Sequence, residues 1–470
     1  MRKIKEFIKS IILTFLVLSM LTMSLRIMIV DRMVQEGTFK SSVRALLQSI
    51  GLPGIADFFK EESITSDITY STERFIYPSF IVVRNNEGVF AAAYNRDNII
   101  NAFSGIKNVI TKVIKSNPAQ DYKKPFSTLI TEKGILIDTG RSLSLDIVMR
   151  VSENSRSTVK RLFFRYCFIT ETNNKLSVYV KNEETNSVYV FSSKNSELLT
   201  EYNKYLTNAS SSQVFSPAMI SSDMQFNGIN TPPWLLSYKA GTLSLSPSTP
   251  SNIIYNKTDK AFNAQYLSSV LKIFGFNYNS VRRDTEKNGS VIYVENLSSI
   301  TITPQGRALF STSQPEGGLS LSTFGEEVSE NGYSLQNIIV AAHKLIDSFD
   351  KRLTGGSDAD LRFSNAYFED ESGTCVIDFD YVINGMPVKL SGDHPYAARI
   401  KYSDGYFTEA DITFRTYAKS GTAFSPMQID NAIILAGLSH PNKDVLTADI
   451  EYNDTGDKEM IPDYRVYFKK

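Results

Sequence analysis

The chain has few of the residues that build metal sites and covalent cross-links. Its 470 residues include two cysteines, Cys167 and Cys375, and three histidines. Two cysteines exclude a small secreted fold held together by disulfides. Each cysteine lies in an apolar run, which favours two buried thiols; a disulfide between them is the alternative. The histidines are too few and too scattered to suggest a metal site.

The chain also lacks an excess of charge of either sign. It has 50 lysines and arginines and 50 aspartates and glutamates, whereas a nucleic-acid-binding protein normally has a basic excess. We therefore expect no nucleic-acid partner. The hydrophobic share of 42% and the charged share of 21% are typical of a folded protein. At this length we expect two to four domains.

What the sequence does contain is one long apolar segment near its N-terminus. The stretch from Ile8 to Val30 is long enough to cross a hydrocarbon core of about 30 Å as a helix. Basic residues dominate positions 1–9, which predicts a cytoplasmic N-terminus. Bulky residues follow the apolar core where a signal peptidase needs small ones. We interpret the segment as an uncleaved anchor that leaves the bulk of the chain outside the cytoplasm; a cleavable signal peptide is the alternative.

Three hydroxyl side chains of this segment fall on one broad face of the predicted helix: Ser10, Thr14 and Thr22. Small polar residues can hold membrane helices together through hydrogen bonds. They are therefore candidate contacts to a partner helix in the membrane. The alternative is that each hydroxyl bonds only to the backbone of its own helix.

The remaining sequence predicts an α+β fold with antiparallel sheets and helix-hairpin (α-β-β) units. Its proposed parts are a cytoplasmic tail and transmembrane anchor (1–30), an N-terminal extracytoplasmic α+β domain (31–230), a linker rich in proline and serine (231–252), a middle α-β-β domain (253–312) and a C-terminal domain with two α-β-β units (325–470). Trp234 lies in the linker and is expected to hold it against the protein rather than to bind a partner.

Helices are expected where apolar residues recur every three to four positions, at 35–58, 97–115, 260–274, 335–349 and 426–438. Ser334 is a candidate N-cap. Strands are expected where apolar and polar residues alternate. They are predicted on both sides of 85–88 and at 134–138, 144–151, 161–170, 176–182, 188–191, 290–295, 300–310, 362–369, 375–383, 396–402, 406–417, 445–452 and 464–468. Asn384–Gly385 and Asp404–Gly405 are hairpin signals.

The enzyme class that best fits an N-terminal anchor is a penicillin-binding-type serine acyl enzyme, which uses S-x-x-K, S-x-N and K-[ST]-G motifs. Fragments of these motifs occur at 157–160, 193–195 and 419–421. S-x-x-K recurs elsewhere as often as chance predicts in a chain rich in serine and lysine, so the motif is weak. Glycine-rich phosphate loops are absent. We therefore expect no catalytic residues, no cofactor and no enzyme activity.

Two carboxylate clusters could in principle bind a cation, but both have a simpler interpretation. Glu369, Asp370 and Glu371 stand at a predicted strand end. Asp378 and Asp380 lie on one face of a predicted strand, and we expect that face to be solvent-exposed. No metal site is predicted from either cluster.

The order of these segments resembles one known family. Residues 8–18 resemble the start of the YycH family, membrane-anchored regulators of the WalK (YycG) sensor histidine kinase. Gly134–Gly140 with 143–148 and 175–191 look like its β-rich N-terminal region, and 280–310 resembles its middle segment. The helix and hairpin of 426–468 are similar to the close of YycH and of its sister YycI.

The resemblance implies a non-enzymatic regulator of a Gram-positive cell-wall two-component system. The implied partners are the membrane, a WalK-type sensor histidine kinase and a YycI-like sister regulator. A protein that binds one kinase conformation better than another shifts the kinase between them. A structural or chaperone-like envelope module is the alternative function.

Overall fold

The structure is a computed structural model. It describes residues 72–116, 118–124, 126–129, 132–149, 162–182, 185–208, 217–218, 235–236, 243–325, 333–349, 357–369, 373–391, 394–441, 443, 445–456 and 458–468. The predicted anchor with Ser10, Thr14 and Thr22, the predicted helix at 35–58, the S-x-x-K fragment at 157–160 and Trp234 lie outside these residues. Among the helices that are described, none has the length and hydrophobicity of a bilayer-spanning helix.

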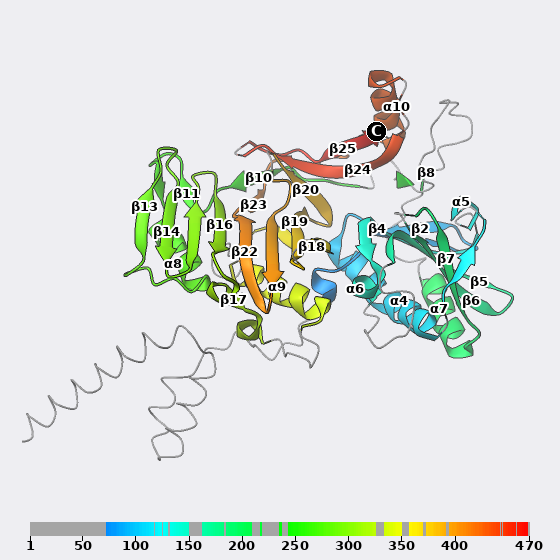
Figure 1. Cartoon of the computed structure of the whole chain (residues 1–470). Coiled ribbons are helices and arrows are strands. Elements are labelled where there is room, and N and C mark those ends of the chain that lie inside the picture. The colour runs from blue at the N-terminus through cyan, green and yellow to red at the C-terminus, as the bar shows by residue number, and fades with distance from the viewer. Residues whose placement is uncertain are drawn as a thin grey trace, which may run out of the picture. The chain divides into compact units, whose positions relative to one another are not determined.

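Contacts along the chain define two compact units. The larger of them consists of Tyr70–Ser322 with Glu326–Lys470. It is a mixed α+β structure whose strands pair almost entirely in antiparallel fashion (Figure 1).

A seven-stranded antiparallel sheet is formed by the N-terminal part of this unit, in the order β2-β1-β4-β5-β6-β7-β3. Its strands are β1 (Phe80–Arg84), β2 (Val89–Ala92), β3 (Gln120–Tyr122), β4 (Gly134–Ser144), β5 (Phe163–Thr172), β6 (Lys175–Asn182) and β7 (Val188–Ser193). Helices α4 (Arg96–Ser116) and α7 (Ser196–Asn208) contact each other and the sheet. The short helices α5 (Phe126–Leu129) and α6 (Leu145–Met149) complete this region.

Helix α4 forms because its sequence offers both a start signal and a continuous apolar face. The side chain of Asn95 accepts a hydrogen bond from the Asn98 N–H at 3.0 Å, as an N-cap does. Phe103, Ile106 and Val109 are at most 1% exposed and lie on the face that meets the sheet. Each buried side chain of this size contributes about 1.5–3 kcal/mol to folding.

A twelve-stranded sheet follows, with the path β13-β14-β15-β16-β22-β21-β19-β20-β24-β25; β17 joins at β22 and β18 at β19. Its strands are β13 (Arg282–Thr285), β14 (Val291–Glu295), β15 (Ser298–Ile302), β16 (Arg307–Thr312), β17 (Leu319–Ser320), β18 (Ala359–Phe368), β19 (Cys375–Ile383), β20 (Met386–Leu390), β21 (Ala398–Ser403), β22 (Tyr406–Thr413), β24 (Val445–Asp454) and β25 (Asp463–Phe468). Among the described strands, β20 and β24 form the one parallel pair.

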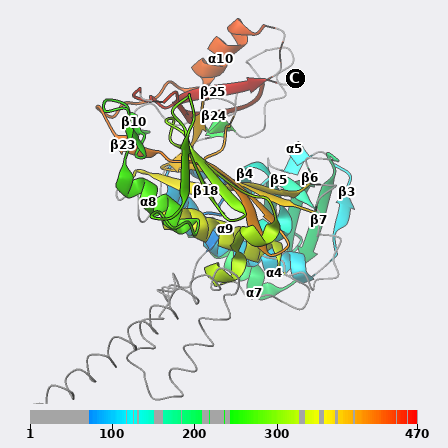
Figure 2. The ribbon, with the colours of Figure 1, turned by 60° about the vertical axis from the view of Figure 1, so that its left-hand side comes forward.

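Three helices accompany this sheet: α8 (Ala264–Ile273), α9 (Leu335–Phe349) and α10 (Ile429–Ser439). Helices α8 and α9 lie side by side (Figure 2), and α9 contacts β21. Phe274, which caps α8, lies 4.7 Å from Phe310 of β16, ring centre to ring centre. Helix α10 contacts β24 and β25. Helices thus cover parts of the sheet that would otherwise expose apolar residues.

Three short pairs complete the list of described strands: β10 (Ser248–Ser251) with β23 (Thr416–Lys419), β11 (Tyr255–Asn256) with β12 (Ala261–Phe262), and β8 (Pro217–Ala218) with β9 (Leu235–Leu236). β10 belongs to the segment interpreted above as a linker. β16 pairs with β22, so the twelve-stranded sheet contains strands from the segments assigned to both the middle and the C-terminal domain. The division into domains stays a prediction.

Local sequence signals correctly located several elements. Helix α9 begins after Ser334, whose Oγ accepts a hydrogen bond from the Asn337 N–H at 3.1 Å, so the predicted N-cap is confirmed. The β19–β20 hairpin turns at Asn384 and Gly385, with φ of 52° and 83°. The β21–β22 hairpin turns at Asp404 and Gly405, with φ of 51° and 92°. Positive φ at both central residues is typical of a type I′ turn.

The strand predicted at 144–151 is wrong. β4 ends at Ser144, and Leu145–Met149 forms the helix α6. The side chain of Asp146 accepts a hydrogen bond from the Ile147 N–H at 3.0 Å, and Ser144 Oγ donates to the same carboxylate. A carboxylate in the first turn favours a helix, and a run of five residues is too short for its periodicity to distinguish helix from strand.

The single strand predicted at 300–310 is two strands. β15 and β16 are joined by a turn whose last residue, Gly306, has φ of 86°. Ile300 pairs with Phe310, and Ile302 pairs with Ala308. The buried apolar residues of both strands stand at even-numbered positions, so the alternation continues past the turn as it would in one strand. The pattern therefore does not reveal the hairpin.

Asp378 and Asp380 do share one face of β19, but the expectation that this face is solvent-exposed is wrong. The two residues are 7% and 3% exposed, and all nine residues of β19 are buried. Each carboxylate has an arginine partner: Arg399 binds Asp378, and Arg141 of β4 lies 2.5 Å from Asp380. A buried carboxylate needs such a partner because an isolated charge is costly to desolvate.

Both cysteines are buried and free, as the first of the two interpretations predicted. Cys167 and Cys375 are each 0% exposed. Burial raises the pKa of Cys375 to about 12, and it raises the pKa of Cys167 as well. A thiol held neutral in this way is a poor nucleophile.

Candidate functional site

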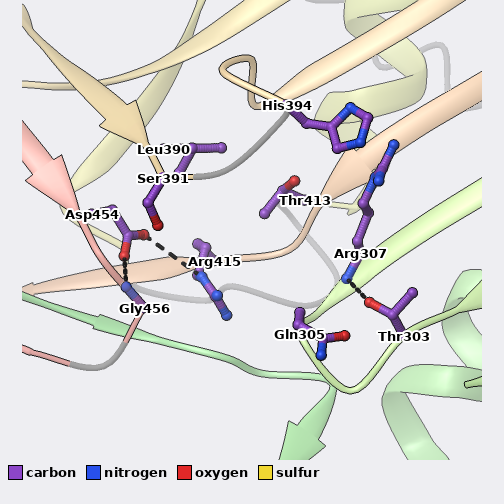
Figure 3. A pocket seen from close by; sticks show the side chains of 10 residues that line it. All are labelled: Thr303, Gln305, Arg307, Leu390, Ser391, His394, Thr413, Arg415, Asp454 and Gly456. Atoms are coloured by element: carbon purple, nitrogen blue, oxygen red, sulfur yellow. Dashed lines mark hydrogen bonds and ion pairs between the residues drawn. The ribbon is translucent and has the colours of Figure 1, made fainter. Parts of the chain in front are cut away.

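A polar pocket lies where the two parallel strands of the large sheet end together (Figure 3). Its volume is about 310 Å³. The lining residues are Thr303, Gln305, Arg307, Leu390, Ser391, His394, Thr413, Arg415, Asp454 and Gly456.

The parallel pairing of β20 with β24 explains why a hollow forms here. Leu390 and Asp454 are the last residues of the two strands and are paired in register. The Ser391 N–H donates a further hydrogen bond to the Asp454 carbonyl at 2.9 Å. Parallel neighbours leave a sheet in the same direction, so the two following loops border a common space. The β15–β16 turn, His394 and the C-terminal end of β22 with Arg415 just beyond it supply the other walls.

One side of the pocket is built around Asp411. Arg307 donates to both carboxylate oxygens through Nε and Nη2. The Tyr396 hydroxyl donates to the same carboxylate at 2.9 Å, and His394 Nδ1 lies 3.1 Å from the Tyr396 oxygen. Burial, and then Asp411, raise the pKa of Tyr396 to about 12. The phenol therefore stays a donor, and Arg307 is held in a defined orientation.

The other side is built around Asp454, which is 2% exposed. Its carboxylate accepts hydrogen bonds from the Tyr417 hydroxyl at 2.9 Å and from the Gly456 N–H at 2.7 Å. Burial is the main cause that raises the pKa of Tyr417 well above its usual range. Arg415 Nε lies 3.6 Å from the carboxylate, which is an ion pair but not a hydrogen bond. Figure 3 shows the Arg415 side chain next to Asp454 and Gly456.

The arrangement presents hydrogen-bond donors to the pocket. Arg307 and Arg415 are cationic, and Ser391, Thr303 and Thr413 contribute hydroxyls. The Asp454 carboxylate on the wall already has neighbouring donors. Such a set can bind and orient a ligand that carries acceptor oxygens.

Sequence reasoning did not find this pocket. Its residues come from separate positions between 303 and 456, with no spacing that reads as a motif. Two of the motif fragments that the sequence did suggest lie on different strands: Ser193 ends β7 of the seven-stranded sheet, and Lys419 ends β23. The candidate contacts Ser10, Thr14 and Thr22 lie outside the described residues and stay a prediction.

Comparisons with known proteins add one finding. No protein-family model matches the chain, and no curated protein matches it. Among solved structures, the chain is similar to the crystal structure of YycH from Bacillus subtilis, with a TM-score of 0.49 and 11% sequence identity. The match covers 85% of this chain and 96% of the YycH chain. A likeness at this level assigns neither a family nor a function.

Proposed function

We propose that this protein is a membrane-anchored accessory regulator of a cell-envelope two-component sensor histidine kinase. It acts without catalysis, through its N-terminal helix in the membrane and its α+β domains outside the cytoplasm. Its partners are a kinase of the WalK type and a sister regulator of the YycI type in a Gram-positive cell envelope.

The observation that carries this proposal is the ordered resemblance of the sequence to the YycH family. Three of the resembling segments overlap structural units: 175–191 covers β6 and most of β7, 280–310 contains β13 to β15, and 426–468 contains α10 with β24 and β25. The basic residues before the apolar stretch Ile8–Val30 support the proposed anchor and its orientation.

Exposed apolar side chains near the C-terminus also suit a protein that works through partners. Leu435 and Leu438 of α10 are 52% and 71% exposed, and Ile461 is 59% exposed. Exposed apolar side chains can contribute to contact with another protein. The same feature suits a structural or chaperone-like envelope module, so the two functions need an experiment that separates them.

The separating experiment exchanges the membrane segment. In one variant, an unrelated membrane helix of equal length replaces residues 8–30; in a second, Ser10, Thr14 and Thr22 are all changed to alanine. A kinase regulator that contacts its partner in the membrane loses control of the kinase-dependent reporter in the first variant and loses part of it in the second. Both variants are expected to reach the membrane in normal amounts.

Co-purification in detergent provides the second measurement. The wild-type chain should bring a sensor histidine kinase with it, and the exchanged variant should bring much less. If the exchanged variant regulates the reporter normally, the chain is a tethered module and the regulatory mechanism proposed here is wrong.

A further inference from the structure

The ion pair between Arg415 and Asp454 differs in geometry from two other arginine–aspartate pairs among the described residues. Arg165 donates to both oxygens of Asp138 at 2.9 and 3.1 Å, and Arg399 does the same to Asp378 at 2.7 and 2.9 Å. Arg415 instead approaches Asp454 no closer than 3.6 Å. A planar guanidinium normally binds a carboxylate through two parallel hydrogen bonds.

Arg415 is also left with unused donors. Its side chain is 12% exposed, and its Nη1 is buried without a hydrogen-bond partner. A buried donor without an acceptor is unfavourable, more so on a charged group. Arg415 also lines the pocket, so an acceptor oxygen bound beside its guanidinium would supply a hydrogen bond that the long ion pair with Asp454 does not.

The charges and hydroxyl groups around the pocket limit the kind of ligand that it can bind. Arg307 is matched by Asp411, and Arg415 faces Asp454, so the cations have nearby carboxylates. Net attraction of anions is therefore modest, and selectivity must come from directed hydrogen bonds. The volume of about 310 Å³ is at the small end of ligand pockets. The hydroxyls of Ser391, Thr303 and Thr413 can bond to hydroxyl groups of a ligand.

We propose that this pocket binds the oxyanion group of a small hydroxylated molecule, with Arg415 as the main contact to its oxygens. A phosphate ester and a sugar acid share this chemistry. The inference does not depend on the proposed function: a ligand site here would exist whether or not the chain regulates a kinase.

The test is calorimetric titration of the purified full chain with inorganic phosphate, glycerol 3-phosphate and glucuronate, and with sodium chloride at matched ionic strength. We expect saturable binding of at least one oxyanion and none of chloride. Saturation by the phosphates alone identifies a phosphate ester as the ligand class, and saturation by glucuronate alone identifies a carboxylate.

Two variants test the location of binding. Arg415→Lys keeps the charge but loses the planar pair of donors, and should weaken binding at least tenfold. Ser391→Trp places a large side chain at an exposed rim position and should abolish binding. Its matched control is Ser313→Trp, also at an exposed serine, at the far end of β16 and about 20 Å from Arg307 by strand length.

Melting temperatures of all variants show whether each remains folded. Ser313→Trp should bind as the wild type does. The proposal is overturned if none of the three oxyanions binds saturably, or if folded Arg415→Lys and Ser391→Trp bind as tightly as the wild-type chain.

Discussion

The seven-stranded sheet and the end of the β20–β24 pair both contain a buried aspartate beside an arginine, but the two pairs are built differently. In the first, Asp138 and Arg165 share two hydrogen bonds, and their side chains are 1% and 16% exposed. In the second, Asp454 and Arg415 are equally buried but stay 3.6 Å apart, and the arginine faces a pocket. The comparison separates a pair joined by two hydrogen bonds from a pair whose arginine makes none to its aspartate and borders the pocket.

Breaking the saturated pair should have the largest effect. Asp138→Asn removes the charge that compensates the buried guanidinium of Arg165. Loss of one member of a buried pair costs about 3–5 kcal/mol of unfolding free energy. Urea denaturation of the full chain measures this change. A loss below about 1 kcal/mol would show that Arg165 finds other partners, and the comparison would fail.

The same substitution in the pocket should cost less. Asp454→Asn keeps an oxygen that can accept from the Gly456 N–H or the Tyr417 hydroxyl, and the ion pair that it breaks is already long. We expect a loss of about 1–3 kcal/mol, the range for a disturbed buried hydrogen bond. Parallel urea curves for Asp138→Asn and Asp454→Asn test the order directly. Equal losses would contradict the structural distinction between the two sites.

The pocket also predicts how stability depends on pH. Tyr396 has its pKa raised from 10.0 to about 12 in the folded protein. The folded state therefore holds this proton more tightly than the unfolded state, so the contribution is complete below pH 10 and is lost as the pH rises through about 12. Tyr396→Phe removes the ionisable group and should flatten this fall. A variant whose stability falls as steeply as that of the wild type between pH 10 and 12 would contradict the assignment.

The smallest effect is expected for an exposed pair used as a control. Arg282 and Asp284 lie 3.1 Å apart, and their side chains are 76% and 54% exposed. Water screens such a pair, so Asp284→Asn should change stability by less than about 0.5 kcal/mol. The same urea assay measures it. A larger change would mean that losing an aspartate charge is destabilising regardless of burial.

Local signals in the sequence were sufficient to predict elements whose conformation depends only on residues within the same short segment. The apolar face of α4, the hydroxyl of Ser334 before α9 and the Asn384–Gly385 turn are each defined by neighbours within a few residues. They were predicted correctly because capping, helical period and turn conformation depend on the local chain.

One misjudged feature depends on partners that are distant in sequence. Asp378 and Asp380 alternate with apolar residues as an exposed face would, yet Arg399 and Arg141 accompany them in a buried setting. The β15–β16 turn was missed because apolar residues stay in phase across it. The alternation of apolar and polar residues identifies which side chains share a face of a strand, but not which part of the protein covers that face.

By itself, the amino-acid sequence determined the α+β character of this protein, the helices with strong apolar faces and the tight hairpins, because each arises from interactions within a short stretch of chain. Only the tertiary structure decided that β20 and β24 run parallel, that Asp378 and Asp380 are buried, and that Arg307, His394 and Arg415 border one pocket. These features come from pairing between strands far apart in the chain, and their energetics depend on burial and charge at the assembled site.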